Sequence, residues 1–277
     1  MEITDLPYLI IGIISGIASG LFGIGGGMII VPSMFALGAS AHHAIGISVL
    51  QMIFAAVFGS YINYKKKNLN LKDGIMIGFG GLIGASFSGM LLKALSDVTL
   101  TSVFLAVSCI FFIKYAFGIK ENIVQNQRSV WVKNVILFIA GAFTGIFAIS
   151  LGIGGGLLIA PILAYFLGYD SKKVVSLSLF FVIFASVSGI ISFSNSGVID
   201  SEVIHKGILV GIASMVGVFI GIKIIEKMHI SAHRKILLCV YALSILGTTH
   251  SLLNKLNLIK FLTWIYPSSF NIIMLKS

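Results

Sequence analysis

A glycine run that occurs twice constrains the fold of this chain more than any other feature. The first copy covers residues 23–32 (GIGGGMIIVP) and the second covers residues 152–161 (GIGGGLLIAP), each inside a long apolar stretch. Each glycine costs roughly 1 kcal/mol relative to alanine in a helix. In membrane transporters, Gly/Pro-interrupted segments at corresponding positions of two halves point to the substrate site. We therefore expect both runs to break a helix and to expose their backbone.

The apolar stretches around the runs predict an all-α integral membrane protein. Hydrophobic residues make up 57% of the chain and charged residues only 10%, whereas a soluble domain carries about 25% charged residues. Apolar stretches of about 20 residues favour membrane helices over the short alternating strands of a barrel. No polar stretch is long enough for a soluble domain, so residues 1–277 are predicted to form one membrane domain. The apolar tail, 255–277, contains Trp264 and Tyr266, which suit an interfacial segment.

The net charge of +10 does not indicate a nucleic-acid partner. The lysines fall in short links between apolar stretches, where positive charge sets the orientation in the membrane. The expected partner is therefore the lipid bilayer. Cys109 and Cys239 lie within apolar spans without metal-ligand spacing, so they are predicted to be small core residues. Neither a metal site nor a cofactor is expected.

The repeat extends well beyond the glycines. An offset of 129 residues pairs Gly16 with Gly145 and Pro32 with Pro161. After one inserted residue, an offset of 130 pairs Gly38 with Gly168, Ser48 with Ser178, Gly59 with Gly189, Gly81 with Gly211, Lys93 with Lys223 and Cys109 with Cys239. The pattern predicts a duplication of residues 8–118 as residues 137–248, which we call the first half and the second half.

The first apolar stretch, Pro7–Leu37, is too long for one upright helix. At 1.5 Å per residue it would measure about 46 Å, against a hydrocarbon core of roughly 30 Å. It must break, tilt strongly or fold back. A polar link over Gly118–Ser129 separates the two halves. The other predicted spans are His42–Asn63, Gly74–Leu95, Leu100–Phe117, Val130–Leu167, Val174–Ser194, Ile204–Ile225 and Lys235–Leu253.

Three basic links indicate how the halves are oriented. The links 65–73, 114–133 and 223–235 each carry a net charge of +3. If every apolar stretch crossed once, the 223–235 link would face outside, against the positive-inside rule. If each glycine-broken stretch is a re-entrant hairpin, each half has three further crossings, the second half is inverted, and all three links face the cytoplasm. We favour inverted repeats, with eight simple spans as the alternative.

The glycine runs are also the leading candidates for a binding site. Gly25–Gly27 and Gly154–Gly156 could each end one helix and start another, so that unpaired N–H groups and a positive helix end face an anion. The alternative is close helix packing through small residues, a description that fits Gly16 and Gly20. A dinucleotide fingerprint is excluded because the runs lie in neither a strand–helix unit nor beside an acidic ribose partner.

With these paired Gly-x-Gly-Gly-Gly-x-x-x-x-Pro runs, the chain resembles the TauE/SafE sulfite exporter family of small membrane transporters. The resemblance covers nearly the whole chain before about residue 254. It implies a multi-pass protein of the bacterial cytoplasmic membrane that moves sulfite, a sulfonate or another small sulfur-containing anion. Alternating access is the expected mechanism, and a channel or a transporter for another solute is the alternative. The candidate substrate-binding residues are Gly25, Gly26, Gly27, Pro32, Ser48, Gln51, Gly154, Gly155, Gly156, Pro161 and Ser178.

Some of these polar residues have a second interpretation. Ser48, Gln51 and Ser178 could donate hydrogen bonds to an oxyanion, or they could join helices at about 0.6 kcal/mol each. His43 lies at a span entrance, where it could serve at the interface or as a gate. Ser19 and His43 faintly resemble a serine-protease pair, which needs hydrogen-bond contact. Nothing repeats this pair in the second half, so no enzyme activity is expected.

Overall fold

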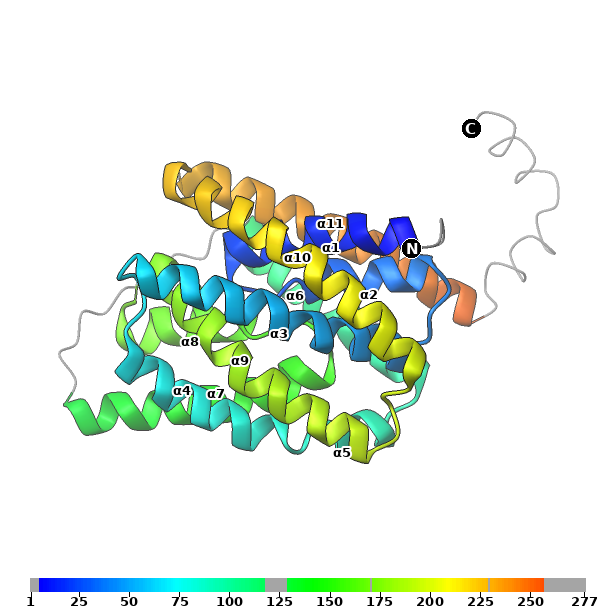
Figure 1. The fold of residues 1–277 in the computed structure, drawn as a ribbon, viewed down its shortest axis with the longest axis horizontal. Helices are drawn as coiled ribbons and strands as arrows, with labels where there is room; N and C mark the ends of the chain where they lie inside the picture. Colours follow the sequence, from blue (N-terminus) through cyan, green and yellow to red (C-terminus); the bar gives the residue numbers. More distant parts are fainter. Residues whose placement is uncertain (1–4, 118–128, 170, 229, 257–277) are drawn as a thin grey trace.

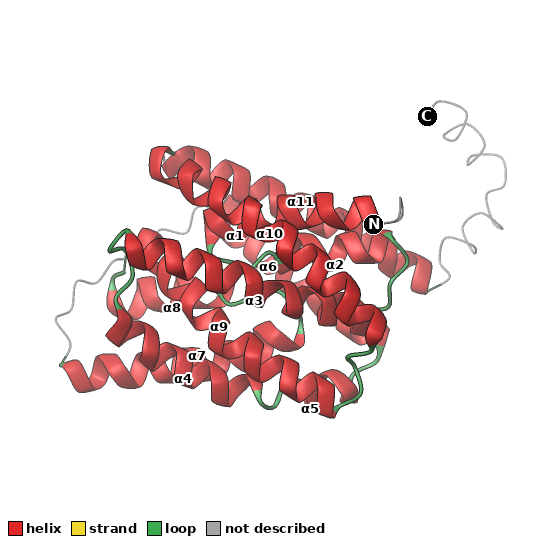
Figure 2. Cartoon of the chain, viewed as in Figure 1, coloured by secondary structure: helices red, strands yellow, loops and turns green. Residues whose placement is uncertain are grey.

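The computed structural model describes residues 5–117, 129–169, 171–228 and 230–256. Within these residues every regular element is a helix (Figure 2), which confirms the predicted all-α class. The predicted tail lies outside the described residues except for Lys255 and Leu256, and so does the polar link except for Ser129. The helices are α1 (Leu6–Phe22), α2 (Gly27–Ala36), α3 (Ala41–Lys65), α4 (Leu71–Ala85), α5 (Ser88–Ala94), α6 (Asp97–Ala116), α7 (Val130–Ser150), α8 (Gly156–Leu167), α9 (Ser171–Asn195), α10 (Ser201–Lys227) and α11 (Ile230–Lys255).

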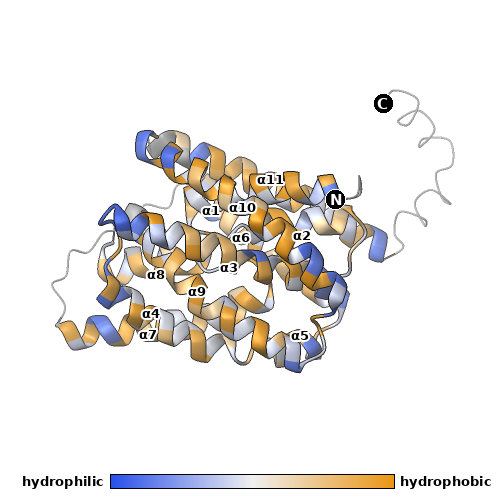
Figure 3. Ribbon diagram, viewed as in Figure 1, coloured by the Kyte–Doolittle hydropathy of each residue, from blue (hydrophilic) through white to orange (hydrophobic). Residues whose placement is uncertain are grey.

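Seven helical segments are long and apolar enough to cross a membrane, counted over the described residues. Figure 3 shows apolar residues along the helices and hydrophilic residues concentrated near their ends, as expected for a multi-pass membrane protein. The segments are Ala41–Lys65, Leu71–Ala94, Asp97–Ala116, Val130–Ser150, Lys173–Asn195, Ser201–Lys227 and Arg234–Lys255.

Both glycine runs break a helix, as predicted. The first run separates α1 from α2, and the second separates α7 from α8. Gly23 ends α1 in the left-handed region, with φ at 68°, and Gly26 precedes α2 with φ at 88°. Glycine adopts these angles without the steric penalty of a side chain. The chain can therefore reverse within four residues.

Each broken stretch returns to the end of the molecule at which it started. Tyr8, at the start of α1, and Leu37, directly after α2, line the same cavity. Lys133, at the start of α7, and Tyr169, which follows α8, both bind the carboxylate of Asp73. The pairs α1–α2 and α7–α8 are therefore helical hairpins, with the glycine runs at their tips.

One predicted span is interrupted. The stretch predicted over Gly74–Leu95 forms two helices, α4 and α5, with a break at Ser86 and Phe87. The hydroxyl of Ser192, on α9, satisfies the broken backbone because it accepts a hydrogen bond from the N–H of Gly89 at 2.9 Å and donates to the carbonyl of Ser86 at 2.7 Å. Hydrogen bonds from a neighbouring helix are what make such a break tolerable in a membrane.

Glycines bring the outer helices into backbone contact with their neighbours. A Cβ added at Gly16 of α1 would lie 2.1 Å from the carbonyl oxygen of Ser214 on α10, and one at Gly20 would lie 2.5 Å from that of Val218. On the other side of the molecule, a Cβ at Gly84 of α4 would lie 2.0 Å from the carbonyl oxygen of Ala142 on α7. The packing interpretation of Gly16 and Gly20 is thus confirmed. The helices α3 and α9 lie between these two pairs (Figure 1).

Candidate functional site

The two glycine runs lie directly against each other. A Cβ added at Gly27 would lie 1.7 Å from the carbonyl oxygen of Gly152, and one at Gly154 would lie 1.8 Å from that of Ile24. Such distances are only possible because the two backbones touch. The prediction that the runs come together is therefore confirmed, and we call this contact between residues 23–27 and 152–156 the glycine junction.

Two serines hold the junction in a crossed arrangement. Ser48, on α3, donates a hydrogen bond to the carbonyl oxygen of Gly152 at 2.8 Å. Ser178, on α9, donates to the carbonyl oxygen of Gly23, also at 2.8 Å. Each serine therefore binds the run of the other half. A hydroxyl has a single hydrogen to donate, so in this structure both serines position the backbone instead of donating to an anion.

The junction lies about half-way along the two central helices. Gly25 is next to Met52, whose Cγ would lie 3.1 Å from a Cβ added at that glycine. Gly155 is next to Phe181, with ring atoms 2.4 Å from an added Cβ. Met52 and Phe181 are near the middle of α3 and α9, which are 25 residues long each.

An unpartnered polar group faces the first run. Helix α2 starts at Gly27 without a side-chain cap, and its amino-terminal end carries a partial positive charge. The N–H groups of Ile29 and Ile30 donate to the carbonyl oxygen of Gly26, so the N–H groups that a ligand could use are those of Gly27 and Met28. A Cβ added at Gly26 would lie 3.1 Å from Oε1 and 3.2 Å from Nε2 of Gln51. Gln51 is fully buried, and among the described residues neither amide atom has a hydrogen-bond partner. Buried polar side chains without partners are rare, so this amide is suited to binding a polar ligand.

The two predicted prolines lie farther along their helices. Pro32 and Pro161 are inside α2 and α8, past the first turn of each. Pro32 packs against α11, where a Cβ added at Gly247 would lie 3.3 Å from the proline Cβ. The structure therefore brings the glycines, Ser48, Gln51 and Ser178 together, with the prolines outside that group.

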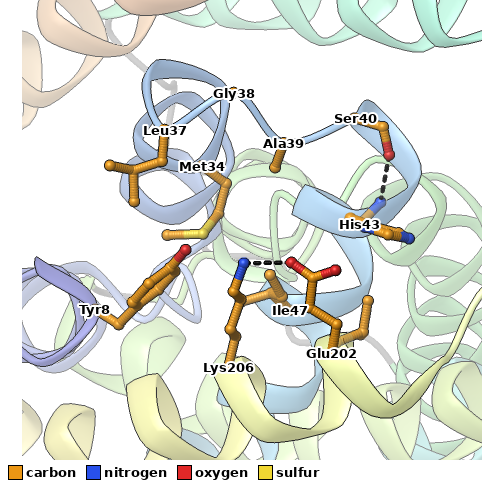
Figure 4. A pocket seen from close by; sticks show the side chains of 11 residues that line it. Tyr8, Met34, Leu37, Gly38, Ala39, Ser40, His43, Ile47, Glu202 and Lys206 are labelled. Atoms are coloured by element: carbon orange, nitrogen blue, oxygen red, sulfur yellow. Dashed lines mark hydrogen bonds and ion pairs between the residues drawn. The ribbon is translucent and has the colours of Figure 1, made fainter. Parts of the chain in front are cut away.

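A cavity of about 260 Å³ lies at the open end of the α1–α2 hairpin (Figure 4). Tyr8, His43, Glu202 and Lys206 line it together with the backbone around Gly38. Ile47 lies at its wall, four residues after His43 on α3. Since residues four apart share a face of a helix, the next residue on this face is Gln51. The cavity thus lies one helical turn from the amide that faces Gly26.

Charged groups at this cavity pair with one another. Nε2 of His43 lies 3.2 Å from Oδ2 of Asp200. This histidine is therefore paired with a carboxylate. The N–H of Val203 and the neighbouring His43 hold the pKa of Asp200 below its usual value. Lys206 pairs with Glu202. The ligand atoms of His43, Asp200 and Glu202 lie within 4.8 Å of one another, but Lys206 already supplies a positive charge there.

The opposite end of the molecule is tied together by a buried carboxylate that the sequence did not single out. Asp73, at the start of α4, is 1% exposed. It accepts hydrogen bonds from Lys133 at 2.6 Å and from Tyr169 at 2.7 Å, and Lys173 lies 3.5 Å away. Burial and the hydrogen bond to Asp73 raise the pKa of Tyr169, so its hydroxyl keeps the proton that it donates. The α7–α8 hairpin, α4 and α9 are joined at this point.

Comparisons with known proteins agree with one another. Residues 8–248 match the family model described as sulfite exporter TauE/SafE. A probable membrane transporter protein of Methanocaldococcus jannaschii is 31% identical over 199 residues, which cover 68% of this chain and 72% of that protein. The probable membrane transporter protein YdhB of Bacillus subtilis is 29% identical over 219 residues, 77% of this chain and 87% of that protein. No solved structure gives a significant match.

Proposed function

Since the chain belongs to the TauE/SafE sulfite exporter family, a family of membrane transporters, we propose that it carries a small sulfur-containing anion across the cell membrane by alternating access. The proposed substrates are sulfite and organosulfonates. The observation that carries this proposal is the glycine junction, where the broken helices of both halves meet half-way along the molecule.

An anion at this depth needs compensating donors, because burying an unpaired charge is very costly. Arg234 is engaged elsewhere: its guanidinium donates to the carbonyl oxygens of Tyr115 and Ala116 at the end of α6. Helix amino termini supply about half a positive charge each. The proposed binding region is therefore the glycine junction, where Gly25–Gly27 and Gly154–Gly156 meet and Gln51 adjoins Gly26. Ser48 and Ser178 hold the two runs in place.

We further propose that the two halves are inverted repeats. The crossed serine bonds support this, because each half contributes the same group to the other half's run. The hairpins support it as well. The open end of α1–α2 adjoins the cavity around Tyr8, whereas the open end of α7–α8 adjoins Asp73. In alternating access, the cavity around Tyr8 would close while the contacts of Asp73 at the other end of the molecule would open.

Cysteine labelling tests this topology. In a variant without Cys109 and Cys239, single cysteines at Lys66 and Arg234 should react with a membrane-impermeant maleimide only after the cells are opened. A single cysteine at the exposed Asn195 should react in intact cells. The physical reason is that the links 65–73 and 223–235 each carry +3 and should remain in the cytoplasm. Labelling of position 234 in intact cells, with position 66 protected, would contradict the inverted arrangement.

Transport itself is tested in proteoliposomes. We expect sulfite, thiosulfate, taurine or sulfoacetate inside the vesicles to accelerate uptake of the same labelled anion, and sulfate serves as the comparison anion. Acceleration by internal substrate indicates a carrier, because internal substrate binds the inward-facing site and lets it return to the outward-facing state. Uptake that internal substrate does not accelerate would indicate a channel, and no uptake of any sulfur anion would contradict the proposed function.

A further inference from the structure

The two halves present different chemistry at the same place. The offset of 129 pairs Gly26 with Gly155, and the offset of 130 pairs Gln51 with Phe181. In the structure the paired residues make the same contact. The amide of Gln51 lies 3.1 Å from a Cβ added at Gly26, and the ring of Phe181 lies 2.4 Å from one added at Gly155. An amide thus faces the first run, and an aromatic ring faces the second.

The surroundings of Gly26 can bind an anion. The amino terminus of α2 supplies N–H donors and a partial positive charge. The amide of Gln51 adds two donors, and both its nitrogen and its oxygen lack partners among the described residues. These groups belong to two helices of the first half, α2 and α3.

The surroundings of Gly155 cannot do the same. Phe181 is 0% exposed, and its ring offers no hydrogen-bond donor. The ring lies against Gly155, in the place that the amide takes beside Gly26. An anion placed there would lose its hydration without gaining a hydrogen bond from the side chain that replaces Gln51, which is unfavourable.

We propose that the two runs are not equivalent and that each chain binds one anion, between the amino terminus of α2 and the amide of Gln51. Phe181 closes the matching place in the second half. This inference rests on the proposed function and names the half of the junction that recognises the substrate. The approach to the site is the 260 Å³ cavity, whose wall residue Ile47 precedes Gln51 by one turn of α3.

Calorimetric titration of the full chain in nanodiscs with sodium sulfite tests the proposal. Wild-type protein should bind one sulfite per chain. Gln51→Leu, which has nearly the same size, should weaken binding at least tenfold, because the donors to the charged ligand are lost. Gln51→Glu should have a larger effect and abolish binding, because it places a like charge beside the anion.

Thermal unfolding separates binding from a structural role of Gln51. Without sulfite, the Tm of Gln51→Leu should equal or exceed that of the wild type, because an unpartnered buried amide is removed. At the same sulfite concentration, the Tm of the wild type should rise clearly more than that of Gln51→Leu. A lower Tm for Gln51→Leu in the absence of sulfite would show that the amide is a structural group and would overturn the assignment.

Phe181→Leu is the matched control at the equivalent position. It should lower the Tm, because it leaves a cavity, but keep the sulfite affinity within threefold (roughly 0.6 kcal/mol) and the stoichiometry at one. Two sites per wild-type chain, unchanged affinity in Gln51→Leu, or equal loss of affinity in a folded Phe181→Leu would each overturn the proposal. If wild-type protein neither binds nor exchanges any sulfur anion, the proposed function itself fails. If it does both and Gln51→Leu behaves like wild type, only the one-sided site fails.

Discussion

Alanine at Gly154 is expected to prevent most of the chain from reaching its folded state. The added Cβ would lie 1.8 Å from the carbonyl oxygen of Ile24, at a residue whose φ is 88°. Backbone atoms on both sides of the glycine junction would have to move apart, and the crossed serine bonds would be lost with them. We expect destabilisation of more than about 4 kcal/mol, measured as loss of the monodisperse peak in size-exclusion chromatography and of cooperative thermal unfolding.

Two controls separate the contact from the backbone strain. Gly197 also has a positive φ, 72°, but nothing among the described residues lies within 4 Å of an added Cβ. Gly197→Ala should therefore cost only the strain, about 1–2 kcal/mol. Gly27 is helical, and an added Cβ there meets the carbonyl oxygen of Gly152 at 1.7 Å, so Gly27→Ala should be as harmful as Gly154→Ala without that strain. Equal stability of the Gly154 and Gly197 variants would show that the two runs do not touch.

This expectation changes how glycine variants can be used. Substitutions such as Gly26→Val or Gly155→Val do not isolate substrate binding from folding. In the structure, an added Cβ at Gly155 already lies 2.4 Å from the ring of Phe181, so loss of transport in that variant would not identify a binding site. Gln51 is a better probe because its amide can be removed without a backbone change.

The second large effect is expected at Asp73. Asp73→Asn keeps the size of the side chain but removes the charge that faces Lys133 and Lys173. Removing one partner of a buried ion pair typically costs 3–5 kcal/mol. We expect about 3 kcal/mol here, because both lysines are about one-third exposed and can reach water. The measurement is thermal unfolding of the purified protein.

The ion pair between Lys66 and Glu226 provides the comparison. It also joins two helices, α3 and α10, with 2.5 Å between Nζ and Oε1, but its partners are 35% and 41% exposed. Glu226→Gln should change stability by less than about 1 kcal/mol, and added salt should reduce the difference further. If Asp73→Asn lowered the free energy of unfolding no more than Glu226→Gln does, the contacts of Asp73 would not be what holds α4 to the α7–α8 hairpin.

The parts of the fold that follow from chain composition could be predicted. The apolar stretches, their lengths and the triple glycines determine membrane helices and two helix breaks, because these depend on local sequence. The break at Ser86 could not be predicted in this way. The equivalent helix of the second half, α10, is continuous, and the broken backbone depends on Ser192, which is 103 residues from Gly89.

The candidate site was only partly predictable for the same reason. The offset pairs Ser48 with Ser178, but their crossed bonds to Gly152 and Gly23 appear only when the two halves are packed together. Asp73 contributed to the sequence argument only as one charge in a basic link. Its hydrogen-bond partners are Lys133, at the end of the 114–133 link, and Tyr169 in the second half. A lone acid among basic residues at a span entrance was the signal that could have singled it out.

The crossed serine bonds also determine the order in which the molecule can be completed. They join residues that are 104 and 155 positions apart. At a synthesis rate of about 5–20 residues per second, Gly23 waits about 8–30 s before Ser178 has been made. During that interval the broken backbone of the first hairpin lacks its second-half partners, and lipid cannot replace them. The first glycine run, although translated early, is therefore among the last parts of the molecule to assemble.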